Sequence, residues 1–440
     1  MSKGKLKFFL IFIGDCLMFY VSLIIVLFFR YGIAYKGYLL AHTIPFLIVL
    51  CLLALIFYIT DLYSDRFIKH GTETWRVFFY SICTSLIISI LCFYIFGNFF
   101  KLTPKTNLLL FWLIFFFLDY VWRFYFGQLI IKKGWQKHIL FIGNSAYIQE
   151  LVDVTQNNPA FGYDAKTISE KFLFIENFES LKKEIDKNKI GTVIIDTKIK
   201  NRANNIKSIY KLIPFGIEII DSRKFYEKIF NKISLEDIDE EWLIENITTG
   251  NYVFSFLKRC FDLFFSIILF FVTLPIFILT SVLVKISSKG PIIFKQLRAG
   301  KNDKSFVLYK FRTMKTGQNG PLWTENNDGR LTKIGKFLHQ THFDELPQLF
   351  NIIRGEISFV GPRAERIELA KTYAEIPYYE IRHIVKPGLT GWAQLYYKAS
   401  TSTEEAKEKL KYDLYYIKNR SFLLDILITL KTIRMFFFKN

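Results

Sequence analysis

The sequence predicts a membrane protein with three parts: an α-helical membrane bundle, a small Rossmann-like α/β domain, and a mainly α-helical C-terminal domain held on one side of the membrane. Three observations support this fold class. The 440-residue chain is 51% hydrophobic and contains 48 phenylalanines, which is too apolar for an ordinary soluble protein. Short strand-like runs alternate with helical ones in the middle of the chain, and a fifth long apolar run is followed by a strongly basic strip.

The N-terminal part, residues 1–134, is predicted to form a bundle of four transmembrane helices. A helix needs about 20 apolar residues to cross about 30 Å of hydrocarbon. Four runs reach this length: 8–29, 39–59, 77–96 and 108–131. Three charged residues lie within them, Asp15, Asp119 and Arg123. We expect these to pair inside the bundle or to reach toward its ends, with a transport or relay role as the alternative.

Basic residues flank the two ends of these helices unequally. One side carries Lys3, Lys5, Lys7, Arg66, Lys69, Arg76, Lys132, Lys133 and Lys137, whereas the other carries only Arg30, Lys36, Lys101 and Lys105. Because Lys and Arg concentrate in cytoplasmic loops, the N-terminus and everything after Lys132 are predicted to be cytoplasmic. The five cysteines lie in or beside apolar runs without C-x-x-C spacing, which predicts neither a disulfide framework nor a zinc site.

The middle part, residues 135–235, is predicted to be a Rossmann-like α/β domain. Its strand candidates are "HILFIGNS", "TVIIDT" and "GIEIID", and a helix is expected over 178–189. The first strand ends at Gly143 and Asn144, where a dinucleotide site would have three glycines in G-x-G-x-x-G. We therefore predict no working cofactor site, although a nucleotide at the following helix N-terminus is the alternative. The acidic segment within 236–251 is predicted to be a linker or docking helix.

A fifth apolar run occupies residues 258–286 and is long enough to span the membrane. Both of its flanks are basic, which argues against crossing. Pro275 near its middle removes a helical hydrogen bond, so a sharp kink or a break is expected there. We predict a re-entrant helix that enters from the cytoplasm and returns to it. A kinked spanning helix is the alternative.

The strip that follows this run is strongly basic. It contains one acid, Asp303, among Lys285, Lys289, Lys295, Arg298, Lys301, Lys304, Lys310, Arg312 and Lys315. Such a strip can bind nucleic acid. Directly after a membrane segment, anionic lipid headgroups and phosphate-bearing substrates explain it better.

Two adjacent acids, Asp344 and Glu345, precede Pro347 and an apolar helical run. Proline is tolerated in the first turn of a helix, so a helix is expected to start near residues 344–346. Taken alone, Asp344 is most simply an N-cap residue. The acid pair can also bind a divalent metal and supply a carboxylate nucleophile for phosphate chemistry.

Four motifs occur in order behind the membrane run. They are "YKFRTM" (309–314), "DGRLTKIGKFL" (328–338), "DELPQLFNIIRGEISFVGPR" (344–363) and "KPGLTGWAQL" (386–395). This set resembles the bacterial polyprenyl-phosphate hexose-1-phosphate transferases, or bacterial sugar transferases, over about 252–440. The resemblance implies a monotopic catalytic domain in the bacterial inner (cytoplasmic) membrane, facing the cytoplasm. The preceding bundle and α/β segment are what large members of that family carry.

The resemblance also implies an activity. The family transfers a sugar 1-phosphate from a UDP-sugar to a polyprenyl (undecaprenyl) phosphate, releasing UMP, and starts exopolysaccharide, O-antigen (lipopolysaccharide) or capsule synthesis. It uses Mg²⁺ and an aspartyl-phosphate-type intermediate. By position, Asp344 would be the nucleophile, with Glu345 helping to bind the metal. Arg363 would bind substrate phosphate, and Lys310 and Arg312 would bind phosphate of the nucleotide or the lipid.

The sequence departs from the family pattern just before the acids. An arginine and a further basic residue are usual there, but His339 and Gln340 occupy these positions. We expect His339 to bind donor phosphate. A transition-metal cluster of His339, His342 and the two acids is the alternative. The C-terminal tail is predicted to be an interfacial amphipathic helix, because charges interrupt its apolar residues.

Two other functions compete with this interpretation. One is an inactive membrane scaffold or regulator. The other is an NAD-dependent nucleotide-sugar-modifying enzyme centred on residues 137–235, against which the missing glycines count. Neither the sugar, the polymer nor homo-oligomerisation follows from the sequence, and nucleic acid is not an expected partner.

Overall fold

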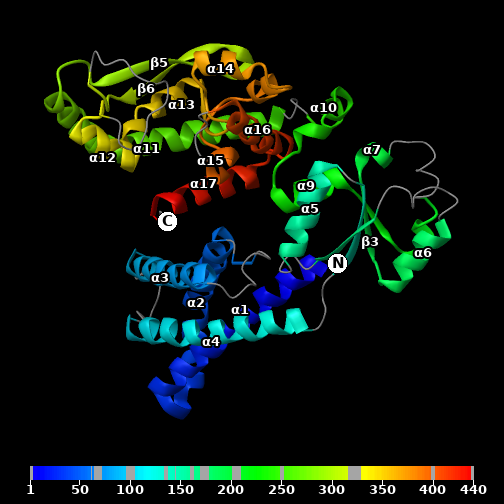
Figure 1. The fold of residues 1–440 in the computed structure, drawn as a ribbon. Coiled ribbons are helices and arrows are strands. Elements are labelled where there is room, and N and C mark those ends of the chain that lie inside the picture. The colour runs from blue at the N-terminus through cyan, green and yellow to red at the C-terminus, as the bar shows by residue number, and fades with distance from the viewer. Residues whose placement is uncertain are drawn as a thin grey trace. The chain divides into compact units, whose positions relative to one another are not determined.

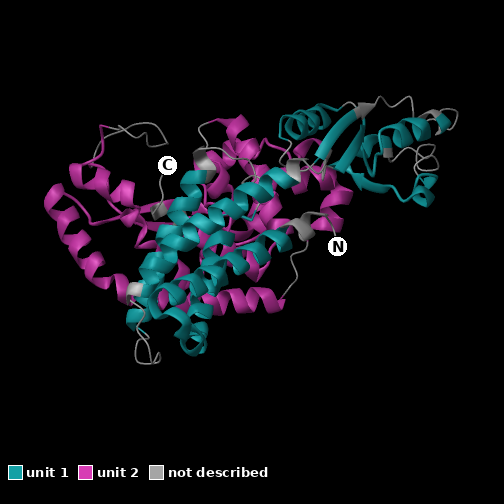
Figure 2. Ribbon diagram, turned by 90° about the horizontal axis from the view of Figure 1, so that it is seen from below, with its two compact units in different colours: residues 1–222 teal, residues 223–440 magenta. Residues whose placement is uncertain are grey.

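The computed structural model describes residues 3–60, 62–63, 72–95, 105–132, 137–143, 145–158, 163–168, 178–200, 210–247, 252–315, 329–397 and 402–437. They form a mostly helical protein with a four-stranded parallel sheet and two two-stranded sheets (Figure 1). The chain divides into two compact units, Met1–Ser222 and Arg223–Asn440 (Figure 2). Four segments are long and apolar enough to cross a membrane: Phe8–Ile59, Trp75–Ile95, Asn107–Leu129 and Tyr252–Ser287.

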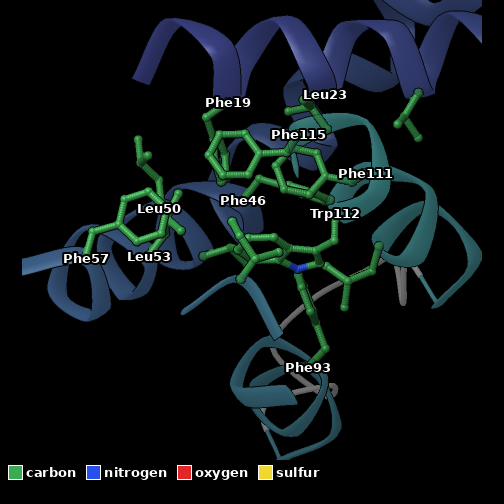
Figure 3. Close-up of a cluster of buried hydrophobic side chains, with 14 of the residues drawn as sticks. Phe19, Leu23, Phe46, Leu50, Leu53, Phe57, Phe93, Phe111, Trp112 and Phe115 are labelled. Carbon is green, nitrogen blue, oxygen red and sulfur yellow. The ribbon is translucent and has the colours of Figure 1, made fainter. Parts of the chain in front are cut away.

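The first unit begins with the four predicted membrane helices. They are α1 (Lys3–Tyr31), α2 (Tyr35–Ile59), α3 (Thr72–Ile95) and α4 (Lys105–Lys132), with the short turn η1 (Gly32–Ala34) between the first two. Each helix packs against the next, and α4 also packs against α1. Aromatic rings fill the middle of the bundle (Figure 3). Phe19 meets Phe111 edge-on with ring centroids 4.7 Å apart, a favourable aromatic geometry.

The charged residues of the bundle pair with one another, as predicted. Arg123 donates hydrogen bonds to Asp119 Oδ2 at 2.9 Å, to Asp15 Oδ2, and to the carbonyl oxygen of Leu62 at 3.0 Å. Both acids are buried. The basic residues Arg66, Lys69, Lys101 and Lys133, used above to predict orientation, lie outside the described residues.

The second half of this unit is a four-stranded parallel sheet in the order β2-β1-β3-β4. Strands β1 (Lys137–Ile142), β3 (Thr192–Ile195) and β4 (Glu218–Asp221) confirm the three predicted strands. The edge strand β2 (Tyr163–Ile168) was not predicted. Helices α5 (Ala146–Asn157), α6 (Phe178–Lys187) and α7 (Thr197–Lys200) and the turn η7 (Ile213–Phe215) connect these strands, and α6 matches the predicted helix.

The end of β1 is closely packed. Gly143 has φ 144°, and a Cβ there would lie 2.6 Å from Cβ of Asp196, which follows β3 and is buried. Only glycine fits this backbone conformation and this close approach. Asn144, the next residue of the predicted cofactor region, lies outside the described residues.

The segment between the sheet and the last apolar helix belongs to the second unit. It contains α9 (Ser222–Phe230), η8 (Leu235–Asp237) and α10 (Glu240–Asn246). Ile233 and Ile238 are buried with Tyr373 and Leu410 in one apolar cluster. The predicted boundary at residue 235 therefore differs from the division at Ser222, because this segment is tied into the C-terminal core.

The fifth apolar run is α11 (Tyr252–Ser287), with Pro275 inside it. The helix continues through Pro275, so the predicted break is not present. Phe270 and Phe277 on either side of the proline both pack against Phe350, at centroid distances of 5.1 and 6.1 Å. These contacts hold both helical turns in place without a break, whereas re-entry stays a prediction about the membrane.

The remainder of the second unit packs against part of α11. An antiparallel hairpin joins β5 (Ile293–Ala299) to β6 (Ser305–Phe311) through η9 (Lys301–Asp303). Next come α12 (Lys333–Thr341), η10 (Phe343–Glu345), α13 (Gln348–Arg354), β7 (Ser358–Val360), α14 (Ile367–Tyr373), η11 (Tyr379–Ile384), β8 (Gly388–Thr390) and α15 (Trp392–Tyr396). Strands β7 and β8 pair in parallel.

The C-terminal tail forms two helices, α16 (Thr403–Lys418) and α17 (Phe422–Phe437). Asp425 on α17 accepts hydrogen bonds from Lys258 Nζ on α11 and from the Tyr416 hydroxyl on α16, the latter at 2.8 Å. Ile428 is buried, while Leu423 stays exposed. Helix α17 is thus part of the packed unit, and its placement at a membrane interface stays a prediction.

Candidate active site

Asp344 and Glu345 lie in η10, the turn between α12 and α13. His342 begins this turn with φ 56°, which reverses the chain after α12. The following helix, α13, starts only at Gln348, and Pro347 is its N-cap residue. The simple interpretation of Asp344 as an N-cap is therefore wrong, because neither η10 nor α13 has a side-chain cap hydrogen bond. The acid pair needs another explanation.

Lys310 joins the two acids. It lies near the end of β6 and donates a hydrogen bond of 2.6 Å to Glu345 Oε1. Its Nζ is also 4.0 Å from Asp344 Oδ2. Asp344 is buried, and its Oδ1 has no hydrogen-bond partner among the described residues. The site therefore contains a carboxylate whose second oxygen is left for a ligand.

The ionisation of Glu345 follows from its neighbours. Burial by itself raises the pKa of Glu345, but the positive charges of Lys310 and Arg363 outweigh it and bring the pKa to about 2. Arg363 Nη2 lies 3.6 Å from Glu345 Oε1. Glu345 is consequently an anion at neutral pH, and it holds two cations beside Asp344.

The loop that carries Arg363 is fixed from behind by Arg382 and by the neighbouring strand β8. Arg382 Nη2 donates to the carbonyl oxygen of Arg363 at 3.0 Å. The amide of Gly361 donates to Thr390 O at 2.9 Å, and that of Gly388 to Pro362 O at 2.9 Å. A Cβ on Gly388 would lie 2.1 Å from the Gly361 nitrogen, so the close approach of these two backbone segments requires glycine at position 388.

A buried ionic network surrounds Arg382. Glu365 is paired with Lys409 and lies 3.7 Å from Arg382, which also pairs with Asp413 at 3.0 Å and donates to the Tyr379 hydroxyl at 2.5 Å. Burial raises the pKa of Glu365, but the charges of Lys409 and Arg382 prevail and bring it to about 2. Lys409 and Arg382 thus offset the negative charge of Glu365. Arg363 interacts with Glu345 instead.

A pocket lies beside the acids. Its polar lining comes from Arg298, Lys310, Gln348 and Arg363, and its apolar lining includes Leu308 and Leu389. Arg298 was expected only as part of the basic strip, and Gln348 was not singled out within its motif. One sequence pattern could have identified Arg298 as a site residue. Side chains alternate between the two faces along the strands on either side of the turn at 301–303, and this alternation puts Arg298 on the same face as Lys310.

Of two other predicted site residues, His339 lies near the acids and Arg312 binds the end of α11. Arg312 is buried and donates to the carbonyl oxygens of Ser288 at 2.6 Å and of Lys289 and Val284 at 3.3 Å. It therefore binds carbonyl oxygens at the C-terminal end of α11, and no described ion pair joins it to the acids. His339 does approach them, because its Nδ1 lies 3.9 Å from Asp344 Oδ2.

The histidines and acids do not form the alternative transition-metal cluster. Within the described part of the chain, no group of three or more His, Cys, Asp or Glu side chains could hold a metal ion. The His339 and His342 rings have centroids 6.4 Å apart. The arrangement instead offers one carboxylate, a cationic pocket and a partly exposed histidine, which is a set suited to binding and attacking phosphate.

Comparisons with known proteins identify the family of this chain. Residues 253–439 match the family model described as bacterial sugar transferase. A UDP-N-acetylgalactosamine-undecaprenyl-phosphate N-acetylgalactosaminephosphotransferase from Aeromonas hydrophila is 35% identical over 50% of this chain and 52% of its own length, so the match covers about half of that relative. The exopolysaccharide production protein PSS of Rhizobium leguminosarum is 40% identical over 40% of this chain and 93% of its own length.

A longer match includes part of the first unit. The UDP-glucose:undecaprenyl-phosphate glucose-1-phosphate transferase of Escherichia coli is 31% identical over 316 residues, which cover 69% of this chain and 68% of the relative. This match is longer than the segment 253–439, so it extends beyond the family model. On these matches, and with three of the four motifs contributing residues to one pocket, the chain belongs to the bacterial sugar transferase family.

Proposed function

We propose that this chain transfers a sugar 1-phosphate from a UDP-sugar to a polyprenyl phosphate, such as undecaprenyl phosphate, and releases UMP. The observation that carries this proposal is Asp344, a buried carboxylate with one unpartnered oxygen beside the cationic pocket. The relatives from Aeromonas and Escherichia are named as transferases of this kind, which supports it. The Rhizobium relative is named as an exopolysaccharide production protein. We propose that the reaction starts exopolysaccharide, O-antigen or capsule synthesis.

In the proposed first step, a carboxylate oxygen of Asp344 attacks the phosphorus atom next to the sugar. The bond from that phosphorus to the UMP oxygen breaks, and a glycosyl phosphate stays on Asp344. In the second step, an oxygen of polyprenyl phosphate attacks the same phosphorus, the bond to Asp344 breaks, and the carboxylate is restored. The covalent step lets a soluble donor and a membrane-held acceptor use one site in turn.

The residues around Asp344 make this attack feasible. A carboxylate and a diphosphate repel each other unless cations offset their charges. Lys310 lies 4.0 Å from Asp344, and Glu345 fixes its position through a 2.6 Å hydrogen bond. Arg363 supplies a planar fork suited to phosphate oxygens. His339 Nδ1 lies 3.9 Å from Asp344 Oδ2, and we propose that it donates to the same phosphate.

Mg²⁺ is the proposed cofactor, and the acid pair fits it. Mg²⁺ prefers one or two carboxylates together with substrate oxygens and waters. Asp344 Oδ1 is buried without a hydrogen-bond partner among the described residues, so Asp344 would hold the ion. Glu345 Oε1 is already bonded to Lys310, which leaves its other oxygen to contribute. When bound, Mg²⁺ supplies positive charge that stabilises the phosphate under attack.

Contacts at the two ends of α11 support the proposed membrane placement. Near its start, Arg259 donates to the carbonyl oxygens of Ile352 and Ile353 at 2.6 and 2.7 Å. Near its end, Val284 is buried with Phe311. Both ends are thus bound to the same unit. Between them most apolar side chains are exposed, so we propose that α11 enters the bilayer from the cytoplasmic side and does not cross it.

Epitope tags test this topology in intact bacterial cells. A tag before Lys258 and a tag after Lys285 are both expected to be inaccessible from outside, because both ends of α11 contact one cytoplasmic unit. A tag inserted at Gly32–Ala34, on the predicted outer side of the bundle, provides the positive control. External labelling of the tag after Lys285, without labelling of the tag before Lys258, would show that α11 crosses the membrane.

The activity itself is tested by UMP release. The purified protein is supplied with a panel of UDP-sugars, Mg²⁺ and polyprenyl phosphate. We expect UMP release that depends on the sugar and rises steeply with acceptor, since the acceptor regenerates Asp344. If no donor in a broad panel gives UMP, the proposed function is wrong.

A further inference from the structure

Arg298 and Lys310 occupy one face of the β5–β6 hairpin. The register pairs Arg298 with Phe306 and Lys310 with Phe294, and cross-strand partners share a face of a sheet. Both side chains line the pocket beside the acids, together with Arg363. Lys310 is the one that reaches the acid pair, at 4.0 Å from Asp344. Arg298 lines this pocket without an ion pair to either acid among the described contacts.

The Arg298 guanidinium is buried and only partly bonded. Its Nη1 donates to Ala364 O at 3.0 Å and its Nη2 to Gln296 Oε1 at 2.6 Å. Its Nε is buried and has no hydrogen-bond partner among the described residues. A buried donor without a partner is unfavourable. Neither described acceptor is an anion, so the positive charge of Arg298 is not neutralised by a direct partner.

The surroundings make an anion favourable here. Burial and the nearby charge of Arg363 lower the pKa of Arg298 to about 10, while Glu365 and Glu345 act in the opposite direction more weakly. Arg298 is still protonated at neutral pH. A dianion in the pocket would interact with Arg298 and Arg363 at once and remove the repulsion between them.

The chemistry of a double displacement indicates which anion binds beside Arg298. In phosphoryl transfer the attacking and leaving oxygens lie roughly in line across the phosphorus. UMP therefore departs on the side opposite Asp344. The acceptor must later attack opposite the bond to Asp344, which is the same side. One position thus receives two phosphate monoesters in turn, first that of the departing UMP and then that of the arriving polyprenyl phosphate.

We propose that Arg298 binds this phosphate monoester and so serves both half-reactions. The proposal rests on the proposed transferase function and adds to it a binding residue shared by donor and acceptor. Lys310 then acts on the phosphate being transferred, and Arg298 acts on the phosphate at the far end of the in-line arrangement.

Binding measurements on the Asp344→Asn protein test this without turnover. The affinities of UMP and of uridine, which lacks the phosphate, are compared before and after adding Arg298→Gln. Loss of a charged hydrogen-bond donor is expected to weaken UMP binding about tenfold to hundredfold and to leave uridine binding unchanged. Arg298→Lys keeps the charge and is expected to give an intermediate loss. Lys371→Gln, which removes an exposed cation from α14, is the matched control.

Turnover measurements test whether Arg298 also binds the acceptor phosphate. In the protein with Asp344 intact, Arg298→Lys is expected to raise KM for polyprenyl phosphate as well as for the UDP-sugar, and UMP is expected to compete with the acceptor. The proposal is overturned if UMP affinity is unchanged, if UMP and uridine affinities fall equally, or if KM for the acceptor does not move. Absence of UMP release from the normal protein would instead refute the transferase function, because phosphate binding by Asp344→Asn would still be measurable.

Discussion

The Asp344→Asn protein is expected to lose at least about a thousandfold in UMP release, because removing a catalytic nucleophile typically costs this much or more. The amide is nearly isosteric with the carboxylate but carries no charge and cannot form the glycosyl phosphate intermediate. Asp344 is buried, and its Oδ1 is unpartnered in the described structure, so asparagine adds no lost hydrogen bond at that atom. The folded unit should therefore persist while the chemistry stops.

Intact-mass measurement extends this result. Incubated with UDP-sugar and Mg²⁺ but no acceptor, the normal protein should gain the mass of a sugar phosphate, and Asp344→Asn should not. Glu375→Gln, which changes an exposed acid of the same unit, should behave as the normal protein does. UMP release by Asp344→Asn at the normal rate would show that another group is the nucleophile.

The Glu365→Gln protein is expected to lose about 3–5 kcal/mol of unfolding free energy in the second unit, the usual cost of removing one partner from a buried ionic contact. Glu365 is paired with Lys409 and lies 3.7 Å from Arg382, and all three side chains are buried. The substitution leaves Lys409 without its described anionic partner. Since Arg382 also holds the Arg363 carbonyl, transfer activity should fall together with stability.

Thermal unfolding in detergent measures this effect, with Glu380→Gln as an exposed control. The pKa of Glu365 is about 2 when folded and about 4.3 for an ordinary glutamate, so its folded-state pKa is depressed. Its contribution is then complete above about pH 4.3 and is lost as the pH falls toward 2. The difference between normal and variant proteins should shrink over that window. Equal unfolding midpoints at neutral pH would contradict the role given to Glu365.

Much of the fold could be predicted because its signals are local. Long apolar runs identified the membrane helices, and compact runs such as "TVIIDT" identified buried strands. Strand β2, at Tyr163–Ile168, was not predicted. It lies at the edge of the sheet, where a strand needs only one buried side, and polar residues recur along its sequence. The attachment of residues 223–247 to the second unit was also missed, since it depends on Ile233 and Ile238 meeting residues far along the chain.

The candidate site shows the same division between local and long-range information. Asp344, Glu345 and Arg363 follow from motif order, but their grouping around Lys310 depends on the packing of β6 against η10. Lys310 and Arg312, two residues apart, were expected to act together. Strand β6 ends at Phe311, so Arg312 leaves the alternation and caps α11. Pro275 was expected to kink or break α11. The helix continues through it, with aromatic packing on both sides.

The fate of the sugar-proximal phosphorus tests the central claim most directly. A UDP-sugar labelled with ³²P at that phosphorus is supplied with Mg²⁺ and polyprenyl phosphate, and the lipid and aqueous products are separated. The proposed reaction predicts that the label enters the lipid together with the sugar and that the released nucleotide is unlabelled UMP. Sugar in the lipid with the label left in UDP would contradict it, because that result describes transfer of the sugar alone.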